Sequence, residues 1–239
     1  MLEPDPVGVL RAVSVAGNYR KWMFRKIEPE LGSRVLDIGS GLGDFAELFA
    51  RPHSERRVIL SDASKEMTEE ILRRTTGMSC LEVMKLDVSA ENAPSDFPGS
   101  FVPDTVTCIN VLEHIEDDIR ALSNMRKWVV PGGRLVLLVP ALDCLYGSFD
   151  RLAGHYRRYD RRKLSDCLKA SGWALRRLEY FNFWGMFSWF LGGRILRQKE
   201  FNPAICGHLD RLVPLLSFLE KVIRPPVGQS LIAVAENPL

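Results

Sequence analysis

The fold is decided by the stretch RVLDIGSGLGDF, which occupies residues 34–45. Its first half is a short apolar run that contains an acid, and its second half carries glycine at every other position. The residues that follow, 45–49, have the apolar spacing of a helix. The pattern predicts a strand, a glycine-rich turn and a helix. Because glycine has no Cβ, such a turn brings backbone N–H groups and the positive end of a helix against a ligand, which we expect to be nucleotide-like.

Length and composition predict one α/β domain over residues 1–239, since 46% of the chain is hydrophobic. The 32 Lys and Arg nearly balance the 30 Asp and Glu, so we expect no nucleic-acid partner. The five cysteines are scattered and form no CxxC pair, which predicts neither a disulfide framework nor a metal site. The N-terminus carries Glu3 and Asp5 and no apolar core segment, so we expect no signal peptide and a cytoplasmic protein.

The details of the turn distinguish between cofactors. A dinucleotide site reads GxGxxG. Gly39 and Gly41 fit that pattern, but Asp44 stands where the last glycine belongs, and Gly43 comes one residue early. Asp37, just before the turn, would repel a pyrophosphate and could attract an ammonium group. A nicotinamide-binding oxidoreductase is therefore the weaker alternative.

Residues Val35 to Gly43 match the whole of the pattern hh(D/E)hGxGxG, and in this the chain resembles the class I S-adenosylmethionine-dependent methyltransferases. The resemblance implies a doubly wound, seven-stranded, mostly parallel sheet. It also implies S-adenosylmethionine as cofactor and S-adenosylhomocysteine as product. Asp37 and the three glycines would then bind the cofactor.

Two further acids follow at the same interval. A strand at 57–62 ends in Asp62, and a strand at 81–88 contains Asp87, so the three acids recur every 25 residues. Acids at the carboxyl ends of parallel strands meet at one ligand-binding edge, where Asp62 could accept hydrogen bonds from ribose hydroxyls. The alternative is that each acid only caps a helix, a role for which Ser64 competes. The resemblance assigns Ala63 to the same site, and Asp87 and Val88 to the adenine ring.

A fourth strand, at 104–114, runs into the sequence NVLEHIEDD at residues 110–118, which resembles the family's fourth motif at the mouth of the cofactor pocket. The resemblance places Asn110 and Val111 beside the cofactor. His114 is a candidate general base, although a histidine here more often orients the loop or caps a helix. Glu113 is a weaker candidate than His114.

The remaining strands are predicted at 134–140, 172–181 and 230–236. They divide the domain into an N-terminal helical lid at 1–33, a cofactor-binding core at 34–140, an acceptor-site loop and helix at 141–172, and a helical cap insertion at 182–226. Within the lid, the resemblance suggests that Tyr19 covers the cofactor. The alternative is that 1–33 only packs on the sheet edge.

The loop at 145–159 is aromatic, basic and punctuated by glycine. Its position in the chain is where the family places the roof of the acceptor site. His155 is a candidate substrate contact or general base, with Asp150 as its orienting partner. The candidate substrate contacts are Tyr146, Tyr156, Arg157 and Tyr159. The basic residues that follow, 161–163, could belong to a positive patch at this site or to a solvated helix start.

The 182–226 segment is dense in aromatic and aliphatic residues. It could be a cap packed on the core, an apolar acceptor tunnel, or a membrane-surface or dimer face. We therefore expect methyl transfer to an oxygen or nitrogen of a small, largely apolar acceptor with a possible anionic group, by in-line displacement. The alternatives are a membrane-surface enzyme acting on a lipid-like or quinone-type acceptor, with peripheral membrane contact, and a non-catalytic binding module. The oligomeric state stays open.

Overall fold

The computed structural model describes residues 5–50, 55–91 and 97–238, and the prediction that involves Glu3 lies outside them. Seven strands form one sheet in the order β3-β2-β1-β4-β5-β7-β6. Only β7 is antiparallel to its neighbours, so the predicted doubly wound, mostly parallel sheet is confirmed. The strands are β1 (Arg34–Ile38), β2 (Arg57–Asp62), β3 (Leu81–Lys85), β4 (Thr105–Ile109), β5 (Arg134–Pro140), β6 (Ala174–Phe181) and β7 (Ser230–Glu236).

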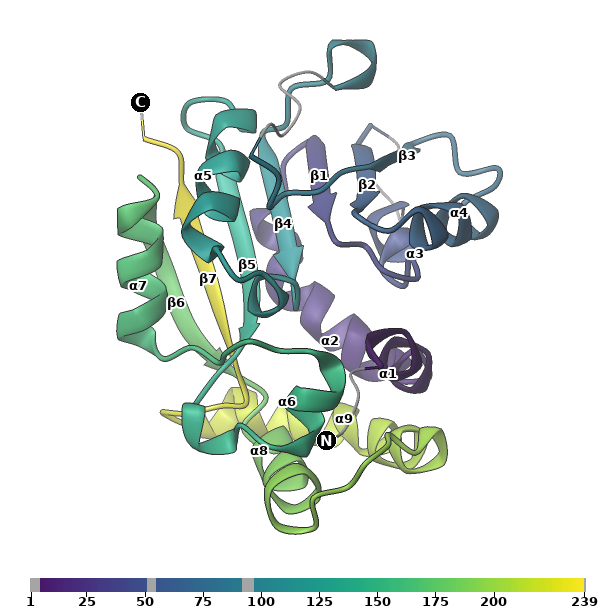
Figure 1. Cartoon of the computed structure of the whole chain (residues 1–239), viewed down its shortest axis with the longest axis vertical. Coiled ribbons are helices and arrows are strands. Elements are labelled where there is room, and N and C mark those ends of the chain that lie inside the picture. The colour runs from purple at the N-terminus through teal and green to yellow at the C-terminus, as the bar shows by residue number, and fades with distance from the viewer. Residues whose placement is uncertain (1–4, 51–54, 92–96, 239) are drawn as a thin grey trace.

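Helices cover both faces of the sheet and gather beyond the carboxyl ends of its parallel strands (Figure 1). Those at that end are α1 (Pro6–Val13), α6 (Ser148–Ala153), α8 (Gly185–Trp189) and α9 (Pro203–Ile223), while α2 (Gly17–Ile27) starts there and runs along one face of the sheet. The others are α3 (Ala46–Ala50), α4 (Lys65–Arg74), α5 (Asp118–Trp128) and α7 (Arg161–Ala170). A π-helix, Phe190–Ile195, continues α8, so the segment between β6 and β7 is helical as predicted.

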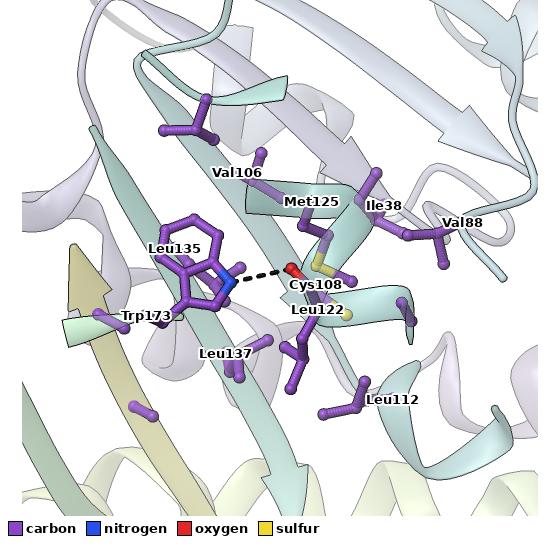
Figure 2. Packing of buried hydrophobic residues seen from close by; sticks show 14 of the residues in the cluster. Ile38, Val88, Val106, Cys108, Leu112, Leu122, Met125, Leu135, Leu137 and Trp173 are labelled. Atoms are coloured by element: carbon purple, nitrogen blue, oxygen red, sulfur yellow. Dashed lines mark hydrogen bonds between the residues drawn. The ribbon is translucent and has the colours of Figure 1, made fainter. Parts of the chain in front are cut away.

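The core lies on both faces of the central strands. Residues 135–139 of β5 are fully buried, as an apolar strand covered on both sides should be. Figure 2 shows Trp173 over β5, where its indole Nε1 donates to the carbonyl oxygen of Leu122 in α5 (2.9 Å). This bond satisfies the one polar atom of a large buried ring, so α5 and the start of β6 are held on the same face.

Local sequence explains the helix starts nearest the site. Ser64 accepts a hydrogen bond from the Met67 N–H and begins α4, and Asp117 does the same for Arg120 in α5. The side chain of Asp160 caps α7 through the Lys163 N–H. Each cap follows a strand or loop at the sheet's carboxyl edge, and therefore fixes where the chain turns away from that edge.

Candidate functional site: a cofactor rim and an acid–histidine cluster

The turn after β1 has the backbone that only glycine adopts readily. Gly39, Gly41 and Gly43 all have positive φ, at +67°, +56° and +73°. A Cβ at Gly39 would lie 2.4 Å from Cγ2 of Val111, the residue that follows Asn110 after β4. At Gly41 it would meet Leu10 of α1 at 3.5 Å. The turn is thus a backbone cradle between β4 and the N-terminal helix, and it fits a ligand held by main-chain N–H groups.

Asp62 lies directly beside this cradle. Its Oδ2 accepts from the Gly41 N–H (3.0 Å) and its Oδ1 from the Ser64 N–H (2.9 Å). Burial raises the pKa of Asp62, although these backbone donors oppose the rise. The cap of α4 is Ser64, so Asp62 is not needed for that role. Ala63 is exposed next to it.

Asp37 is buried at 4% exposure near the end of β1. Its Oδ1 accepts from Thr107 Oγ1 (2.6 Å) and its Oδ2 from Ser40 Oγ (2.7 Å). Desolvation raises the pKa of Asp37 to about 6, against the effect of these two hydroxyls. A neighbouring ammonium group would stabilise the charged form, so the site fits the cationic ligand group predicted for it.

The third acid lies past β3, at the same edge of the sheet. Asp87 is exposed, and its Oδ1 accepts from both the N–H and the Oγ of Ser89 (2.9 and 2.6 Å). Val88 is buried, and its carbonyl accepts from Asn124 Nδ2 (3.0 Å). Because β3, β2 and β1 are neighbours, the three acids lie at or just past the carboxyl ends of adjacent strands, as their spacing predicts. The contact with adenine stays a prediction.

The segment after β4 links the cradle to a second polar centre. Asn110 has φ +53°, and its N–H donates to the Leu138 carbonyl of β5 (2.8 Å). The short 3₁₀ helix Leu112–His114 follows at once. Glu113 and His114 belong to this helix, which directly follows Val111, the residue that packs on Gly39.

The predicted contact between Asp150 and His155 is confirmed. His155 Nδ1 lies 2.9 Å from Asp150 Oδ1. The same oxygen accepts from Arg158 Nε (2.7 Å), and Asp150 Oδ2 accepts from the Gly147 N–H (2.9 Å) and Trp189 Nε1 (3.1 Å). Burial alone would raise the pKa of Asp150, but His155 and Arg158 outweigh it and lower the pKa. Asp150 is thus held as a carboxylate that fixes the imidazole ring.

Glu113 and His114 lie beside Asp150 and His155, and the four residues form the acid–histidine cluster. Glu113 is 1% exposed, and neither carboxylate oxygen has a hydrogen-bond partner among the described residues. Its Oε1 lies 3.9 Å from His155 Nε2, and burial raises the pKa of Glu113 to about 7. The His114 ring packs edge-on against that of His155 at 4.8 Å, and burial lowers the pKa of His114 to about 4.

Donor atoms of Glu113, His114 and His155 lie within 4.8 Å of one another. Carboxylate and neutral imidazole groups are ligands for divalent cations, so this cluster could hold one. The absence of a metal stays a prediction.

The predicted substrate contacts have different surroundings. Tyr156 is 57% exposed, and Tyr146 is half-buried with its hydroxyl donating to the His155 carbonyl (2.8 Å). Arg157 is paired with Asp118 (3.0 Å). Tyr159 lies in the core at 0% exposure and donates to Asp118 Oδ2 (2.8 Å), which differs from the substrate-facing position expected for it. Tyr146 and Tyr156 therefore remain the better candidates for contact with an acceptor.

Tyr19 lies against the end of β6. Its ring stacks on Phe181 (centroids 5.9 Å apart) and meets Trp22 edge-on. Burial raises the pKa of Tyr19 to about 12, while hydrogen bonds with Asn182 and Ser230 oppose that shift. These contacts place it between α2 and the sheet, as in the packing alternative. A contact with the cofactor stays a prediction.

Sequence reasoning missed Arg158 and Trp189 as partners of Asp150. Arg158 is fully buried and lies 5.0 Å from the centre of the Trp189 indole ring. For Arg158, the available signal was its place in an aromatic run that also contains a histidine. Nothing local marks Trp189, because it comes from the insertion after β6.

Comparisons with known proteins agree with this geometry. A family model described as a methyltransferase domain matches residues 17–178, more than half of the chain. The chain is 30% identical over 153 residues to the ubiquinone/menaquinone biosynthesis C-methyltransferase UbiE of Francisella philomiragia. That match covers 61% of this chain and 60% of the relative, so the chain spans less than two thirds of the relative's length.

Solved structures show the same fold. One is phosphoethanolamine N-methyltransferase 2 of Haemonchus contortus in complex with S-adenosyl-L-methionine, with a TM-score of 0.59 and 20% identity, covering 93% of this chain and 53% of that one. Another is an S-adenosylmethionine-dependent methyltransferase from Mesorhizobium loti, with a TM-score of 0.60 and 17% identity, covering 91% and 97%.

Proposed function

The chain belongs to the class I S-adenosylmethionine-dependent methyltransferases, and from this premise we propose that it methylates an oxygen or nitrogen of a small, largely apolar acceptor. The proposal is carried by one observation. Asp150 holds His155 at 2.9 Å, beside the buried carboxylate of Glu113. An ordered imidazole between two acids suits removal of a proton from an acceptor hydroxyl or amine.

The turn from Gly39 to Gly43, together with Asp37 and Asp62, forms the cofactor rim, which binds the cofactor and orients it. The cradle from Gly39 to Gly43 offers main-chain N–H groups, Asp62 suits ribose hydroxyls, and Asp37 suits an ammonium group. When bound, S-adenosylmethionine supplies a methyl group already activated by its positively charged sulfur. The chain therefore contributes mainly by positioning, which can lower a barrier by about 7–11 kcal/mol.

His155 is proposed as the general base, with Asp150 as its positioning residue. A hydrogen bond from Nδ1–H to Asp150 leaves Nε2 without a proton, on the side that faces Glu113. Once Nε2 takes a proton, the imidazolium lies between two carboxyl groups that stabilise its charge. Such a base is typically worth about 10² to 10⁴ in rate.

A second candidate is an acceptor taken from a membrane, of a lipid-like or quinone type. Two observations favour it. UbiE, the relative above, is named as a C-methyltransferase of ubiquinone and menaquinone biosynthesis, which would make carbon the methylated atom. In addition, α8 exposes Phe187 and its Trp189 donates to Asp150, while α9 exposes further large apolar side chains.

The test is transfer of label from methyl-tritiated S-adenosylmethionine to a panel of phenols, amines and quinols. We expect transfer to at least one of them, with His155→Gln slower by about 10²-fold or more. The deficit should shrink as the pH rises, because the acceptor then loses its proton without help. Rates should not change with a chelator, since no metal is predicted.

Asp150→Asn should lose rate in the same direction, whereas the exposed Asp166→Asn serves as the matched control. Binding of S-adenosylhomocysteine by each variant shows that the cofactor site is intact. If no acceptor of the panel is labelled, the result counts against the proposal. Tighter binding of NADH than of S-adenosylhomocysteine would favour the oxidoreductase alternative.

A further inference from the structure

The helix α9 exposes its apolar side. Leu212, Leu215, Phe218 and Val222 are 50–66% exposed, and they lie three or four residues apart along one face. Phe187 of α8 and Leu191 of the π-helix are exposed as well. A surface helix normally buries such a stripe and turns its charges to solvent. An exposed stripe of this size marks an interaction surface.

The acids of α9 point the other way. Asp210 is buried and accepts from the N–H groups of Asn18 and Tyr19 (3.0 and 2.8 Å) in the first turn of α2. Glu220 is buried and accepts from the N–H groups of Asn182 and Phe183 (2.9 and 2.7 Å). The helix is therefore fixed by its carboxylates, with its aliphatic and aromatic side chains left outside.

This inward placement of the acids gives the surface a positive charge. Residues 182–226 are all described, and Glu200 is the one acidic side chain exposed among them. The exposed basic side chains of the segment are Arg194, Arg197, Lys199, Arg211, Lys221 and Arg224. The rest of the protein is close to neutral, since the whole chain carries a formal charge of only +2. Within this segment, the apolar stripe is thus accompanied by exposed cations and by no exposed acid apart from Glu200.

We propose that the α8–α9 surface docks on an anionic lipid bilayer, with α9 lying in the plane of the headgroups. Apolar side chains flanked by Lys and Arg are what an interfacial helix uses, because the chains enter the acyl boundary while the cations pair with lipid phosphates. A symmetric dimer through the same face would bring like charges together, which disfavours a second copy as the occupant. No helix in the described part of the chain combines the length and apolar character needed to cross a bilayer.

The α8 side of the docking surface contacts the acid–histidine cluster. Trp189 of α8 donates to Asp150, and the carbonyl of Gly193 in the π-helix accepts from Ser148 Oγ (3.1 Å). The segment that touches lipid is therefore the one that touches the loop carrying Asp150. Docking goes beyond the proposed function and stands without it, but it would give an apolar acceptor a short path from the bilayer.

The experiment is flotation of the full chain with vesicles of phosphatidylcholine alone or with one third phosphatidylglycerol. We expect binding to the anionic vesicles, at least tenfold weaker binding to the neutral ones, and weakening by salt. Leu215→Glu with Phe218→Glu should reduce partition at least tenfold. Arg211→Gln with Lys221→Gln should reduce it about fivefold for each charge removed. Leu72→Glu is the matched control, since Leu72 is 55% exposed on α4 and should not matter.

Equal binding to both vesicle types, or unchanged binding by the two double variants, would overturn the proposal. A concentration-dependent dimer that is lost in the Leu215→Glu, Phe218→Glu variant, without vesicle binding by the parent, would assign the surface to a second copy instead. Every variant is also titrated with S-adenosylhomocysteine, whose affinity should not change. Label transfer to a water-soluble acceptor tests the proposed function separately, so the two can fail independently.

Discussion

The turn after β1 and the segment between β6 and β7 differ in what determines their residues. In the turn, the backbone itself decides, because three positions need positive φ and one of them allows no Cβ beside Val111. In the segment, the backbone is mostly helical and its residue types are not dictated by backbone conformation, so side chains are placed by what they face. Asp210 and Glu220 face N–H groups, while Leu215 and Phe218 face outward.

This difference decides what each region can reveal about function. A backbone cradle binds through N–H groups that are present whatever the side chains are, and here it fits the cofactor. A side-chain surface binds through its particular residues, which here are proposed to meet the acceptor and the membrane. The cofactor follows from the turn, whereas the proposed acceptor site depends on the loop that carries Asp150 and on α8, whose Trp189 donates to that carboxylate.

The largest expected effect breaks the cradle. In Gly39→Ala, the new Cβ would lie 2.4 Å from Val111 Cγ2 at a residue with φ +67°. We expect S-adenosylhomocysteine affinity to fall at least 100-fold, and the free energy of unfolding to fall by about 2–4 kcal/mol from combined strain and overpacking. Titration calorimetry and urea denaturation measure the two changes.

Gly77→Ala is the control for the strain alone. Gly77 has φ +87°, and a Cβ added there would meet nothing within 4 Å, so we expect about 1–2 kcal/mol of lost stability and unchanged affinity. Equal losses of affinity in the two variants would show that the close approach to Val111 is not what shapes the cradle.

The sequence predicted the rim well, because few residue types satisfy its backbone. The alternation of Gly39, Gly41 and Gly43 predicted the turn, and the interval to Asp62 predicted its position beside Gly41, where it accepts the N–H at 3.0 Å. The seven-stranded, mostly parallel sheet also followed from the resemblance, whereas the order of its strands comes from the structure.

The cluster around Asp150 was only partly predictable. Its contact with His155 is local in the chain, five residues apart, and was expected. Trp189 reaches the same carboxylate from 39 residues away, through a helix whose path no local pattern determines. Tyr159 was misplaced for a similar reason. In an aromatic loop, the direction in which each ring points depends on α5, which supplies Asp118 to its hydroxyl.

A smaller effect is expected at Asp37, because burial makes the charged form of its carboxylate unfavourable. Burial raises the pKa of Asp37 to about 6 from 3.8, so the folded protein keeps this proton to higher pH than the unfolded chain. The wild type should therefore lose stability as the pH rises from about 4 to 6, by up to about 3 kcal/mol, and the loss should persist above that range.

Asp37→Asn should remove that part of the pH dependence. The hydroxyls of Ser40 and Thr107 can accept as well as donate, so they can bond an amide. Thermal unfolding from about pH 4 to 7 should show the variant gaining on the wild type as pH rises, while S-adenosylhomocysteine binds about tenfold more weakly without the charge. An unchanged difference across the range would mean that Asp37 does not titrate there, and Asp166→Asn, an exposed acid, controls for net charge.

The smallest effect tests the boundary between the two regions, at Tyr19 of α2. Its N–H donates to Asp210 of α9, and its hydroxyl bonds with Asn182 and Ser230 at the ends of the strands that flank the insertion. Tyr19→Phe keeps the ring stacked on Phe181 but leaves those partners without the hydroxyl. We expect the free energy of unfolding to fall by about 1 kcal/mol, the typical net value of one such bond. S-adenosylhomocysteine affinity should stay within twofold, because the hydroxyl faces the insertion. A fivefold loss of affinity at unchanged stability would instead assign the hydroxyl to the cofactor, and α2 would then act as a lid over the rim rather than as the support on which α9 is mounted.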